Sequence, residues 1–348
     1  MRPYIDHLIL IGSSVKQALV KLNGLSQDCI LFVVDDYNKL IGSLTDGDVR
    51  RGLLNDFTVE NKLDKIIQLN PRYIRKGNHD IQKIIEYREG DYRVIPVLDE
   101  NDVVINVINF RFIKSYLPID AVIMAGGRGQ RLKPLTDATP KPLLKVGSKP
   151  VMEHNLNRLA MYGIEDFWVS LKYLGEQIED YFGTGIHKNI KIEYVWENKP
   201  LGTIGAVAQI ANFKHDYVLV TNSDLLTNID YEQFFVEFIE QGADLSVLTI
   251  PYQVAIPYAV LETEKGEVKS FKEKPTYTYF SNGGIYLMKR EILAHIPHNT
   301  FFNATDLIED LIKLNKKIIS FPFSGYWLDV GNHEDFAKAQ IDINNVKF

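Results

Sequence analysis

The sequence predicts an α/β protein in two parts: a doubly wound mixed sheet over residues 118–348, preceded by an α+β unit over residues 1–117. Three observations lead to this fold class. Segments of strand and helix character alternate from residue 120 onward, an internal repeat fills the first third of the chain, and a glycine-rich turn follows the first buried strand of the larger part. The length of 348 residues favours two domains over one.

The repeat consists of residues 32–46 and 96–110, which align without gaps at a separation of 64 residues. Each copy has a β-branched run, an Asp-rich turn and a second β-branched run, which predicts strand, turn and strand. A stretch with helical spacing precedes each copy, at residues 15–22 and 81–87. Because one such unit cannot bury its apolar face alone, we expect the two copies to pack on each other.

The second part alternates regularly. Strands are expected at residues 121–125, 167–171, 192–196 and 217–221, and helices at residues 151–162, 176–182 and 203–211. Such alternation predicts a mostly parallel sheet, in which ligands bind beyond the carboxyl ends of the strands. The glycine-rich turn and Asp224 each follow one of these strands, so we expect them to face one crevice.

The glycine-rich turn contains Gly126, Gly127 and Gly129, and two cations, Arg131 and Lys141, follow it. Glycine lets backbone N–H groups approach a ligand, and cations balance an anion, so the pattern predicts a triphosphate site. A dinucleotide-binding turn would need G-x-G-x-x-G and a Walker loop would need Gly-Lys-Ser/Thr, and neither spacing is present. A glycine-rich turn without function remains the alternative, and the two cations argue against it.

Composition and charge exclude several classes of protein. The formal net charge is −6, whereas a nucleic-acid-binding protein carries a basic field, so we expect no nucleic-acid partner. No apolar run approaches the length of a membrane span, and the run at residues 8–11 is too short for a signal-peptide core. Cys29 is the single cysteine, which rules out a disulfide within the chain. We therefore expect a cytoplasmic protein that binds no membrane.

Over about residues 119–342 the chain resembles the sugar-1-phosphate nucleotidyltransferases, which have a Rossmann-like fold. Seven landmarks stand in the family order: residues 126–132 (G-G-x-G-T-R-L), Lys141 in Pro-Lys-Pro, residues 201–206 (L-G-T-x-x-A), Asp224 after a strand, residues 273–275 (E-K-P), residues 282–286 (N-x-G-I-Y) and residues 327–331 (W-x-D-x-G). Gln130 replaces the usual threonine and Ser223 replaces the usual glycine. These departures concern local loop geometry.

The resemblance implies a reaction in which a sugar 1-phosphate attacks the α-phosphate of a nucleoside triphosphate with Mg²⁺ as cofactor. Arg131 and Lys141 are the expected catalytic cations. The resemblance assigns the nucleotide to Ala125, Gly126, Gly127, Gly129, Gly202, Thr203 and Asp224. It assigns the sugar phosphate to Glu273, Lys274, Asn282 and Gly283, and the metal to Asp224 and Asp329. Gly202 and Thr203 are expected to start a helix beside the base.

Taken singly, these residues have ordinary structural alternatives. Asp224 could cap a following helix, Asp329 could belong to a turn, and Glu273 with Lys274 could form a solvated ion pair. Independent accidents in the family order are improbable, which favours the functional interpretation.

In the first part, residues 42–51 resemble the end of a CBS motif, a tandem module that often senses adenine nucleotides. The resemblance assigns its ligand, an adenine or guanine nucleotide, to Thr45 and Asp46. The second copy has Asn109 and Phe110 at these positions, so we expect at most one competent site. The alternative is a structural pair that binds no ligand and serves packing or dimerisation. Paired CBS modules also lead us to expect a homo-oligomer.

Only the resemblance to known families indicates which nucleotide and which sugar phosphate are the substrates. Residues 201–206 resemble guanylyltransferases that act on mannose or heptose 1-phosphate, and a CBS pair fused to this domain resembles nonulosonate-pathway guanylyltransferases that make GDP-glucosamine. We expect GTP and a hexose or amino-hexose 1-phosphate. The alternatives are a UTP or CTP enzyme of the same fold, or an inactive nucleotide-sensing protein. The retained Arg131, Lys141, Asp224 and Asp329 argue against the inactive protein.

Overall fold

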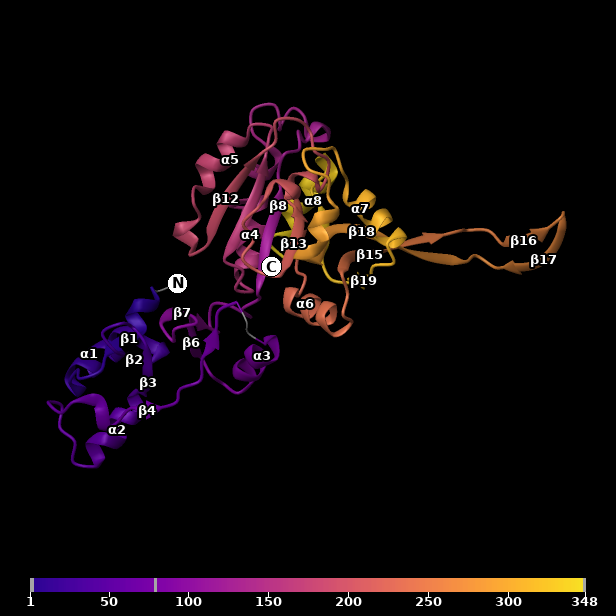
Figure 1. Cartoon of the computed structure of the whole chain (residues 1–348). Coiled ribbons are helices and arrows are strands. Elements are labelled where there is room, and N and C mark those ends of the chain that lie inside the picture. The colour runs from indigo at the N-terminus through magenta and orange to yellow at the C-terminus, as the bar shows by residue number, and fades with distance from the viewer. Residues whose placement is uncertain (1–2, 78–79, 347–348) are drawn as a thin grey trace. The chain divides into compact units, whose positions relative to one another are not determined.

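The computed structural model describes residues 3–77 and 80–346 (Figure 1). The chain divides into two compact units, which we call the front unit and the back unit. The front unit comprises Met1–Pro118 and Ala160–Ile164, and the back unit comprises Ile119–Leu159 and Glu165–Phe348. Their helices and mixed sheets confirm the predicted α/β class.

The first half of the front unit is a four-stranded sheet with two helices. Its strands, in sheet order, are β1 (Leu8–Leu10), β2 (Ile30–Val34), β3 (Leu40–Thr45) and β4 (Gln68–Leu69), and its helices are α1 (Val15–Leu25) and α2 (Asp46–Leu54). Short 3-10 helices lie at η1 (Tyr4–His7), η2 (Ser26–Asp28) and η3 (Leu63–Lys65). Ser14 is the N-cap residue of α1 and forms a capping box with Gln17. Ala18 and Leu22, four residues apart, bury one face of α1 against the sheet.

The second half of the front unit is a smaller version of this arrangement. It contains a sheet in the order β5 (Ile74–Arg75), β6 (Val94–Leu98) and β7 (Val104–Asn109), together with α3 (Ile81–Glu89). The ladder of β2 and β3 shifts register after Val33, and the ladder of β6 and β7 shifts register after Val97, at the equivalent position of the repeat. Lys39 and Val103 form an antiparallel bridge, so the turns of the two copies meet.

The two copies differ where their second strand ends. Thr45 caps α2: its hydroxyl accepts a hydrogen bond from the Asp48 N–H (3.3 Å), and the Asp48 carboxylate accepts one from the Thr45 N–H (2.8 Å). In the second copy the Asn109 side chain accepts a hydrogen bond from the Arg111 N–H (3.1 Å), and residues 110–118, all described, form no helix. The loss of the capping box accounts for the missing helix.

The back unit is built on a seven-stranded mixed sheet. Its strands, in sheet order, are β12 (Lys191–Trp196), β11 (Asp166–Leu171), β8 (Ile119–Met124), β13 (Tyr217–Asn222), β18 (Thr276–Lys289), β15 (Leu245–Ala255) and β19 (Ile318–Pro322). The first four are parallel, β18 is antiparallel to both of its neighbours, and β19 is parallel to β15. The four strands predicted by alternation are all present.

The helices of the back unit are α4 (Val151–Ala160), α5 (Gly175–Phe182), α6 (Tyr231–Glu240), α7 (Ala304–Lys313) and α8 (His333–Asp342). Short 3-10 helices are η4 (Gln130–Leu132), η5 (Lys141–Leu143), η6 (Ile186–Lys188), η7 (Gly205–Gln209) and η8 (Arg290–His295). Val218 and Val220, alternate residues of β13, share a buried cluster with Leu307 and Leu311 of α7. None of the helices within residues 3–77 and 80–346 is long and apolar enough to cross a membrane.

Two short ladders lie beside the main sheet. β9 (Lys145–Val146) pairs with β10 (Lys149–Pro150), and β14 (Leu225–Thr227) pairs with β20 (Trp327–Asp329). Both ladders are antiparallel. The β14–β20 ladder therefore joins the segment that follows β13 to the segment that precedes α8.

The helix predicted over residues 203–211 is wrong, because that segment contains only the 3-10 helix η7. The N–H groups of Ile204 and Gly205 donate to the carbonyl of Phe302, at 3.2 Å each. The Thr203 N–H donates to the side chain of Asn303 (3.2 Å). These long-range bonds replace those that an α-helix would form within the segment. The helical spacing of its apolar residues therefore reflects burial against residues 300–304.

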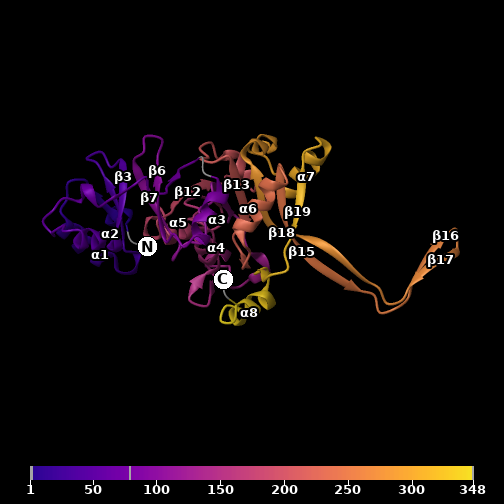
Figure 2. The same ribbon diagram turned by 90° about the horizontal axis from the view of Figure 1, so that it is seen from below.

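β15 and β18 continue beyond the main sheet as a two-stranded ribbon, which we call the arm (residues 251–281). Their pairing runs outward from Thr249 opposite Asn282 to Ala255 opposite Thr276. A hairpin of β16 (Val260–Glu264) and β17 (Glu267–Lys272) forms the outer end. No residue of the arm is buried, and Figures 1 and 2 show it leaving the sheet as a separate ribbon.

Candidate active site

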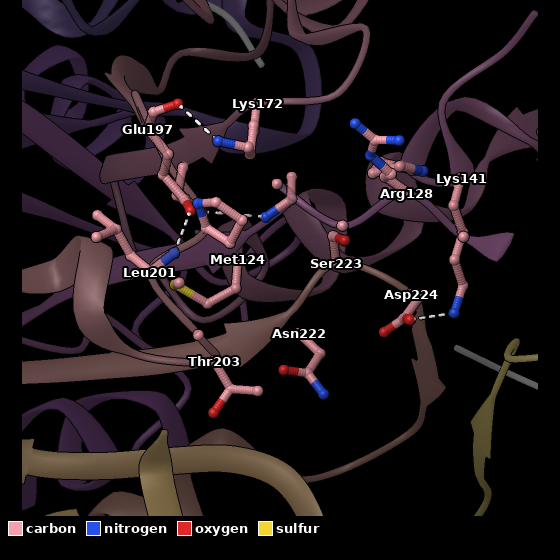
Figure 3. A pocket seen from close by; sticks show the side chains of 18 of the residues that line it. Met124, Arg128, Lys141, Lys172, Glu197, Leu201, Thr203, Asn222, Ser223 and Asp224 are labelled. Atoms are coloured by element: carbon pink, nitrogen blue, oxygen red, sulfur yellow. Dashed lines mark hydrogen bonds and ion pairs between the residues drawn. The ribbon is translucent and has the colours of Figure 1, made fainter. Parts of the chain in front are cut away.

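A pocket of about 630 Å³ lies at the carboxyl ends of β8, β11 and β13 (Figure 3). Ala125, Gly126, Gly127, Gly129, Arg131, Lys141, Gly202, Thr203 and Asp224, which the sequence predicts as site residues, all line it. They come from distant segments, and the parallel strands bring those segments to one edge of the sheet.

The glycine-rich loop forms one wall of this pocket. The Ala125 N–H donates to the carbonyl of Ser170 on β11 (3.1 Å), which fixes the start of the loop to the sheet. Gly129 has a φ of +61°, and a Cβ there would lie 3.0 Å from side-chain carbons of both Thr136 and Lys141. Only glycine suits this position, because it tolerates the left-handed conformation and lets Lys141 pack against the loop.

Lys141, Asp224 and Asp329 form a cluster beside the loop. The Lys141 ammonium donates to Asp224 Oδ2 and lies 3.6 Å from Asp329 Oδ1. The β14–β20 ladder explains why the two aspartates meet. Leu225 pairs opposite Asp329, and the Val330 N–H donates to the Asp224 carbonyl (3.0 Å). Asp224 therefore does not cap a helix, since β14 follows it directly.

The carboxylates of Asp224 and Asp329 suit a magnesium ion. Each has a buried Oδ1 atom with no hydrogen-bond partner among the described residues. Burial, and next the charge of Asp224, raise the pKa of Asp329. Mg²⁺ binds proteins through one or two carboxylates and takes its other ligands from water and substrate phosphates. The oxygen donors and their unsatisfied capacity fit that ion.

Several cations surround the pocket. Arg131 lies on η4, and a Cβ added to Gly331 would approach its Nη2 atom to 2.9 Å. The absence of a side chain at Gly331, two residues after β20, therefore leaves room for the guanidinium of Arg131. Arg128 and Lys172 also line the pocket, and the guanidinium of Arg128 lies 5.7 Å from the ring centroid of Tyr173. This concentration of positive charge beside a glycine loop suits a polyphosphate.

Sequence reasoning missed Lys172 and Glu197. Glu197 Oε2 accepts a hydrogen bond from the Leu201 N–H (3.1 Å), so it anchors the segment that contains Gly202. Burial raises the pKa of the Glu197 carboxyl. Lys172 and Glu197 directly follow β11 and β12, so the rule that ligands bind at carboxyl ends of strands would have found both.

Gly202 and Thr203 form the wall opposite the loop without starting a helix. Gly202 has a φ of +80°, and the Thr203 hydroxyl accepts a hydrogen bond from the Ala304 N–H at the start of α7 (2.9 Å). Thr203 therefore holds α7 in place while lining the pocket.

The predicted sugar-phosphate residues separate into two groups. Asn282 and Gly283 lie on β18 close to the pocket, since a Cβ on the next residue, Gly284, would lie 2.6 Å from the Asn222 side chain. The Gly283 carbonyl accepts a hydrogen bond from the Trp327 indole (2.9 Å). Glu273 and Lys274 lie on the arm and are exposed, and none of the four predicted sugar-phosphate residues is among those that line the pocket.

In the front unit, Thr45 and Asp46 lie at the start of α2. Asp46 is exposed and forms an ion pair with Arg50 at 3.5 Å. A cavity of about 460 Å³ in this unit is lined by residues between Tyr4 and Asn38 and includes neither Thr45 nor Asp46. The nucleotide assignment to these two residues stays a prediction.

A second cluster of ionisable groups lies at the opposite edge of the main sheet, where β8, β11 and β13 begin. Asp120, Asp166 and His215 each contribute one atom to a group within 4.8 Å of one another. Asp120 Oδ2 accepts hydrogen bonds from the N–H groups of Lys214 (2.7 Å) and His215 (2.8 Å), and the Lys214 ammonium donates to Asp166. Burial raises the pKa of Asp120 to about 6.

Comparison with known proteins identifies the class. Residues 120–346 match the nucleotidyl transferase family, and residues 8–55 match the CBS domain. The chain therefore belongs to the nucleotidyl transferase family and carries a CBS domain in its front unit. The CBS match covers the first copy of the repeat.

The relatives that match this chain are named for the transfer of several different nucleotidyl groups. Mannose-1-phosphate guanylyltransferase of Mycobacterium tuberculosis is 32% identical over 65% of this chain and 64% of its own length. D-glycero-α-D-manno-heptose 1-phosphate guanylyltransferase of Aneurinibacillus thermoaerophilus is 31% identical over 65% of this chain and 99% of its own length. The crystal structure of HddC from Yersinia pseudotuberculosis complexed with GMP-PN has a TM-score of 0.50 and 27% identity, over 64% of this chain and 99% of that one. Relatives named for uridylyl and adenylyl transfer also match.

Proposed function

We propose that the protein transfers a nucleotidyl group from a nucleoside triphosphate to a sugar 1-phosphate, giving a nucleotide sugar and pyrophosphate. The observation that carries the proposal is the meeting of the glycine loop with Lys141, Asp224 and Asp329 in and beside one pocket. Membership of the nucleotidyl transferase family supports the reaction class.

The reaction brings two anions together, so it depends on position and charge neutralisation. A phosphate oxygen of the sugar 1-phosphate attacks the α-phosphorus, a new P–O bond forms, and the bond to the β-phosphate oxygen breaks. Arg131 offers a planar fork for the departing pyrophosphate, where negative charge grows. Lys141 offers a compact charge for the α-phosphate. The backbone of the glycine loop holds the triphosphate between them.

We assign a magnesium ion to Asp224 and Asp329, and when bound it would supply neutralising charge to the phosphate oxygens. The unsatisfied Oδ1 atoms of both carboxylates support this assignment.

We favour GTP as the nucleotide. The relatives named above as guanylyltransferases, and the neighbour complexed with GMP-PN, support guanine over other bases. Leu201, Gly202 and Thr203 are the wall that we assign to the base, and Glu197 positions that wall through Leu201. The sugar that we favour is a hexose or amino-hexose 1-phosphate. A UTP or CTP enzyme is the alternative.

Pyrophosphate release from each nucleoside triphosphate, combined with mannose, heptose, glucose and glucosamine 1-phosphates, tests these proposals. We expect release with GTP and one of these sugar phosphates. Release with UTP or CTP alone would replace guanine by a pyrimidine. No release with any pair would favour an inactive nucleotide-binding protein.

For the front unit we propose a regulatory domain over residues 1–117, ahead of a catalytic domain over residues 118–348. The CBS match and the retained Thr45 and Asp46 support a nucleotide ligand on the first copy. Calorimetric titration of the full chain with AMP, which lacks the triphosphate that the catalytic pocket would hold, tests this. No heat, or heat that the Asp46→Ala variant retains, would favour a purely structural pair.

A further inference from the structure

Helix α8 is bonded at two points to the stretch of chain that follows the glycine-rich loop. Near its start, the His333 imidazole donates a hydrogen bond from Nε2 to the carbonyl of Lys133 (2.8 Å). Farther along, the Gln340 amide donates to the carbonyl of Lys145 (2.6 Å) and accepts a hydrogen bond from the Gly147 N–H (3.0 Å). His333 and Gln340 are two helical turns apart, so they lie on one face of α8.

The two cations that we assign to catalysis lie on the stretch that α8 contacts. Arg131 comes just before Lys133, and Lys141 lies between Lys133 and Lys145. Each of the two cations belongs to a 3-10 helix of only 3 residues, η4 and η5. So short a helix has few internal hydrogen bonds. The backbone that carries Arg131 and Lys141 therefore depends on contacts with other parts of the chain.

The Arg131 side chain has few contacts of its own. Among the residues that the structure describes, its guanidinium forms no hydrogen bond and no ion pair, and it lies in the space that Gly331 leaves open. A long side chain without such partners keeps one position only where its backbone and its surroundings are fixed.

The bond from His333 connects the backbone beside Arg131 to a distant part of the chain. Other hydrogen bonds within residues 130–135 are local, such as that from the Leu132 N–H to the Gly129 carbonyl (2.9 Å). Within the described ranges 3–77 and 80–346, His333 provides the only hydrogen bond from a distant residue to the backbone of this stretch. Loss of this bond would leave the backbone of Arg131 held by local bonds and packing.

α8 can serve as a support because it is itself well fixed. The Asn332 side chain caps the helix by accepting hydrogen bonds from the N–H groups of Glu334 (2.9 Å) and Asp335 (3.0 Å). Ala339 of α8 is fully buried in one apolar cluster with Val146, the residue between the two contacts of Gln340. This packing and the two amide hydrogen bonds hold the helix against residues 145–147.

We propose that α8 sets the positions of Arg131 and Lys141 in the pocket, with His333 and Gln340 as positioning residues. Neither positioning residue lines the pocket, so each acts through the backbone that it holds. Displacement of a catalytic group by a fraction of an ångström is enough to lower a rate. This inference rests on the proposed nucleotidyl transfer and adds to it the residues that place its two cations.

Kinetics of His333 variants test the contact near Arg131. His333→Ala removes the donor and should lower kcat about 3- to 10-fold, the effect of one hydrogen bond. The KM values should change little, because we assign Arg131 to the departing pyrophosphate. His333→Gln keeps an N–H donor on a side chain of similar length and should restore most of the rate. His187→Ala, at an exposed histidine of η6, is the control and should behave as wild type.

A double-mutant cycle distinguishes positioning from a general loss of stability. If His333 acts through Arg131, adding His333→Ala to the Arg131→Ala protein should lower kcat no further. A merely structural histidine would cause the same loss in both backgrounds. That result, or a wild-type kcat in His333→Ala, would overturn the positioning role.

Hydrogen exchange of the full chain tests the second contact without the reaction. Gln340→Met keeps the length of the side chain but removes the amide, so the backbone amides of residues 145–147 should exchange roughly 10-fold faster. Its kcat should also fall about 3- to 10-fold, because Lys141 loses a support. Glu334→Gln, at an exposed position of the same helix, is the control and should change neither quantity.

The two measurements also separate this inference from the proposed reaction. Unchanged exchange in Gln340→Met, or faster exchange with a wild-type kcat, would overturn the role of α8. Absence of pyrophosphate release from the wild-type protein would reject the proposed reaction, and with it the positioning of catalytic cations, whatever the exchange rates.

Discussion

The ammonium group of Lys141 donates a hydrogen bond to Asp224, although the two residues are 83 positions apart in the chain. Their side chains are only 11% and 19% exposed, so each charge needs the other for compensation. The same ammonium lies 3.6 Å from Asp329. A substrate phosphate entering beside Lys141 would therefore compete with both carboxylates, and a metal ion on the carboxylates would leave Lys141 available to the phosphate.

Replacing either carboxylate by its amide tests the metal assignment. Asp224→Asn or Asp329→Asn should lower the rate of pyrophosphate release by at least roughly 100-fold, because charge stabilisation at the reacting phosphate is lost. The melting temperature should change little, because Lys141 keeps the other carboxylate as a partner in each variant. Asp137→Asn, at an exposed ion pair with Lys133, is the control and should leave the rate unchanged. Rates near wild type in both variants would reject the metal site.

Arg131 should act on the transition state through its planar fork. Arg131→Ala should cost about 3 kcal/mol of transition-state stabilisation, or roughly 100-fold in kcat/KM. Arg131→Lys keeps the charge but not the fork and should fall between the two proteins. Steady-state kinetics with saturating Mg²⁺ measures both. A loss of thermal stability with kcat/KM unchanged would instead make Arg131 a structural residue.

Asp120 should make the stability of the back unit depend on pH. Burial raises its pKa from 3.8 to about 6, so the folded state favours the protonated form. The resulting stabilisation is complete below pH 3.8 and is lost as the pH rises through about 6. The loss is about 3 kcal/mol by linkage. Denaturant unfolding of wild type and Asp120→Asn at pH 4 and pH 7 should show a difference that grows with pH in favour of the variant. A pH-independent difference would contradict the raised pKa.

Substitutions at Thr45 and Asp46 should separate the effect of the helix cap on stability from any effect on ligand binding in the front unit. Thr45→Ala should lower the free energy of unfolding by about 1 kcal/mol, because the Asp48 N–H loses its acceptor. Thr45→Ser keeps the hydroxyl and should preserve stability. Asp46→Ala removes only an exposed ion pair and should leave stability nearly unchanged while abolishing any binding of AMP. Thermal unfolding and calorimetry of the full chain distinguish these effects, and unchanged AMP binding in Asp46→Ala would contradict the assignment.

The sequence was most informative where local pattern and burial agree. Alternating strand and helix signals located β8, β11, β12 and β13, and the repeat located the matching turns of the front unit. The helix predicted at residues 203–211 was wrong, because its N–H groups bond to Phe302 and Asn303, a hundred residues later. Periodicity reports which side chains are buried and cannot report which distant carbonyl accepts a hydrogen bond.

The same limit applies to the candidate site. The glycine loop, Lys141 and Asp224 could be predicted because they follow strands whose ends share one edge. Lys172 follows β11 and Glu197 follows β12, the two strands that come between β8 and β13 in the chain. The same rule could therefore have predicted both residues. The position of Lys274 on the arm could not be predicted from the sequence. The length of the β15–β18 ladder depends on cross-strand pairing over many residues, which no local signal specifies.

The β14–β20 ladder has a consequence for biosynthesis. Asp224 leaves the ribosome well before Trp327–Asp329, and until β20 has been made and paired, the second carboxylate is missing. A nascent chain can complete its glycine loop and its parallel strands before β20 exists, yet it cannot assemble the pair of carboxylates. Under the proposed metal assignment, turnover would begin only after translation has passed β20 and this ladder has paired.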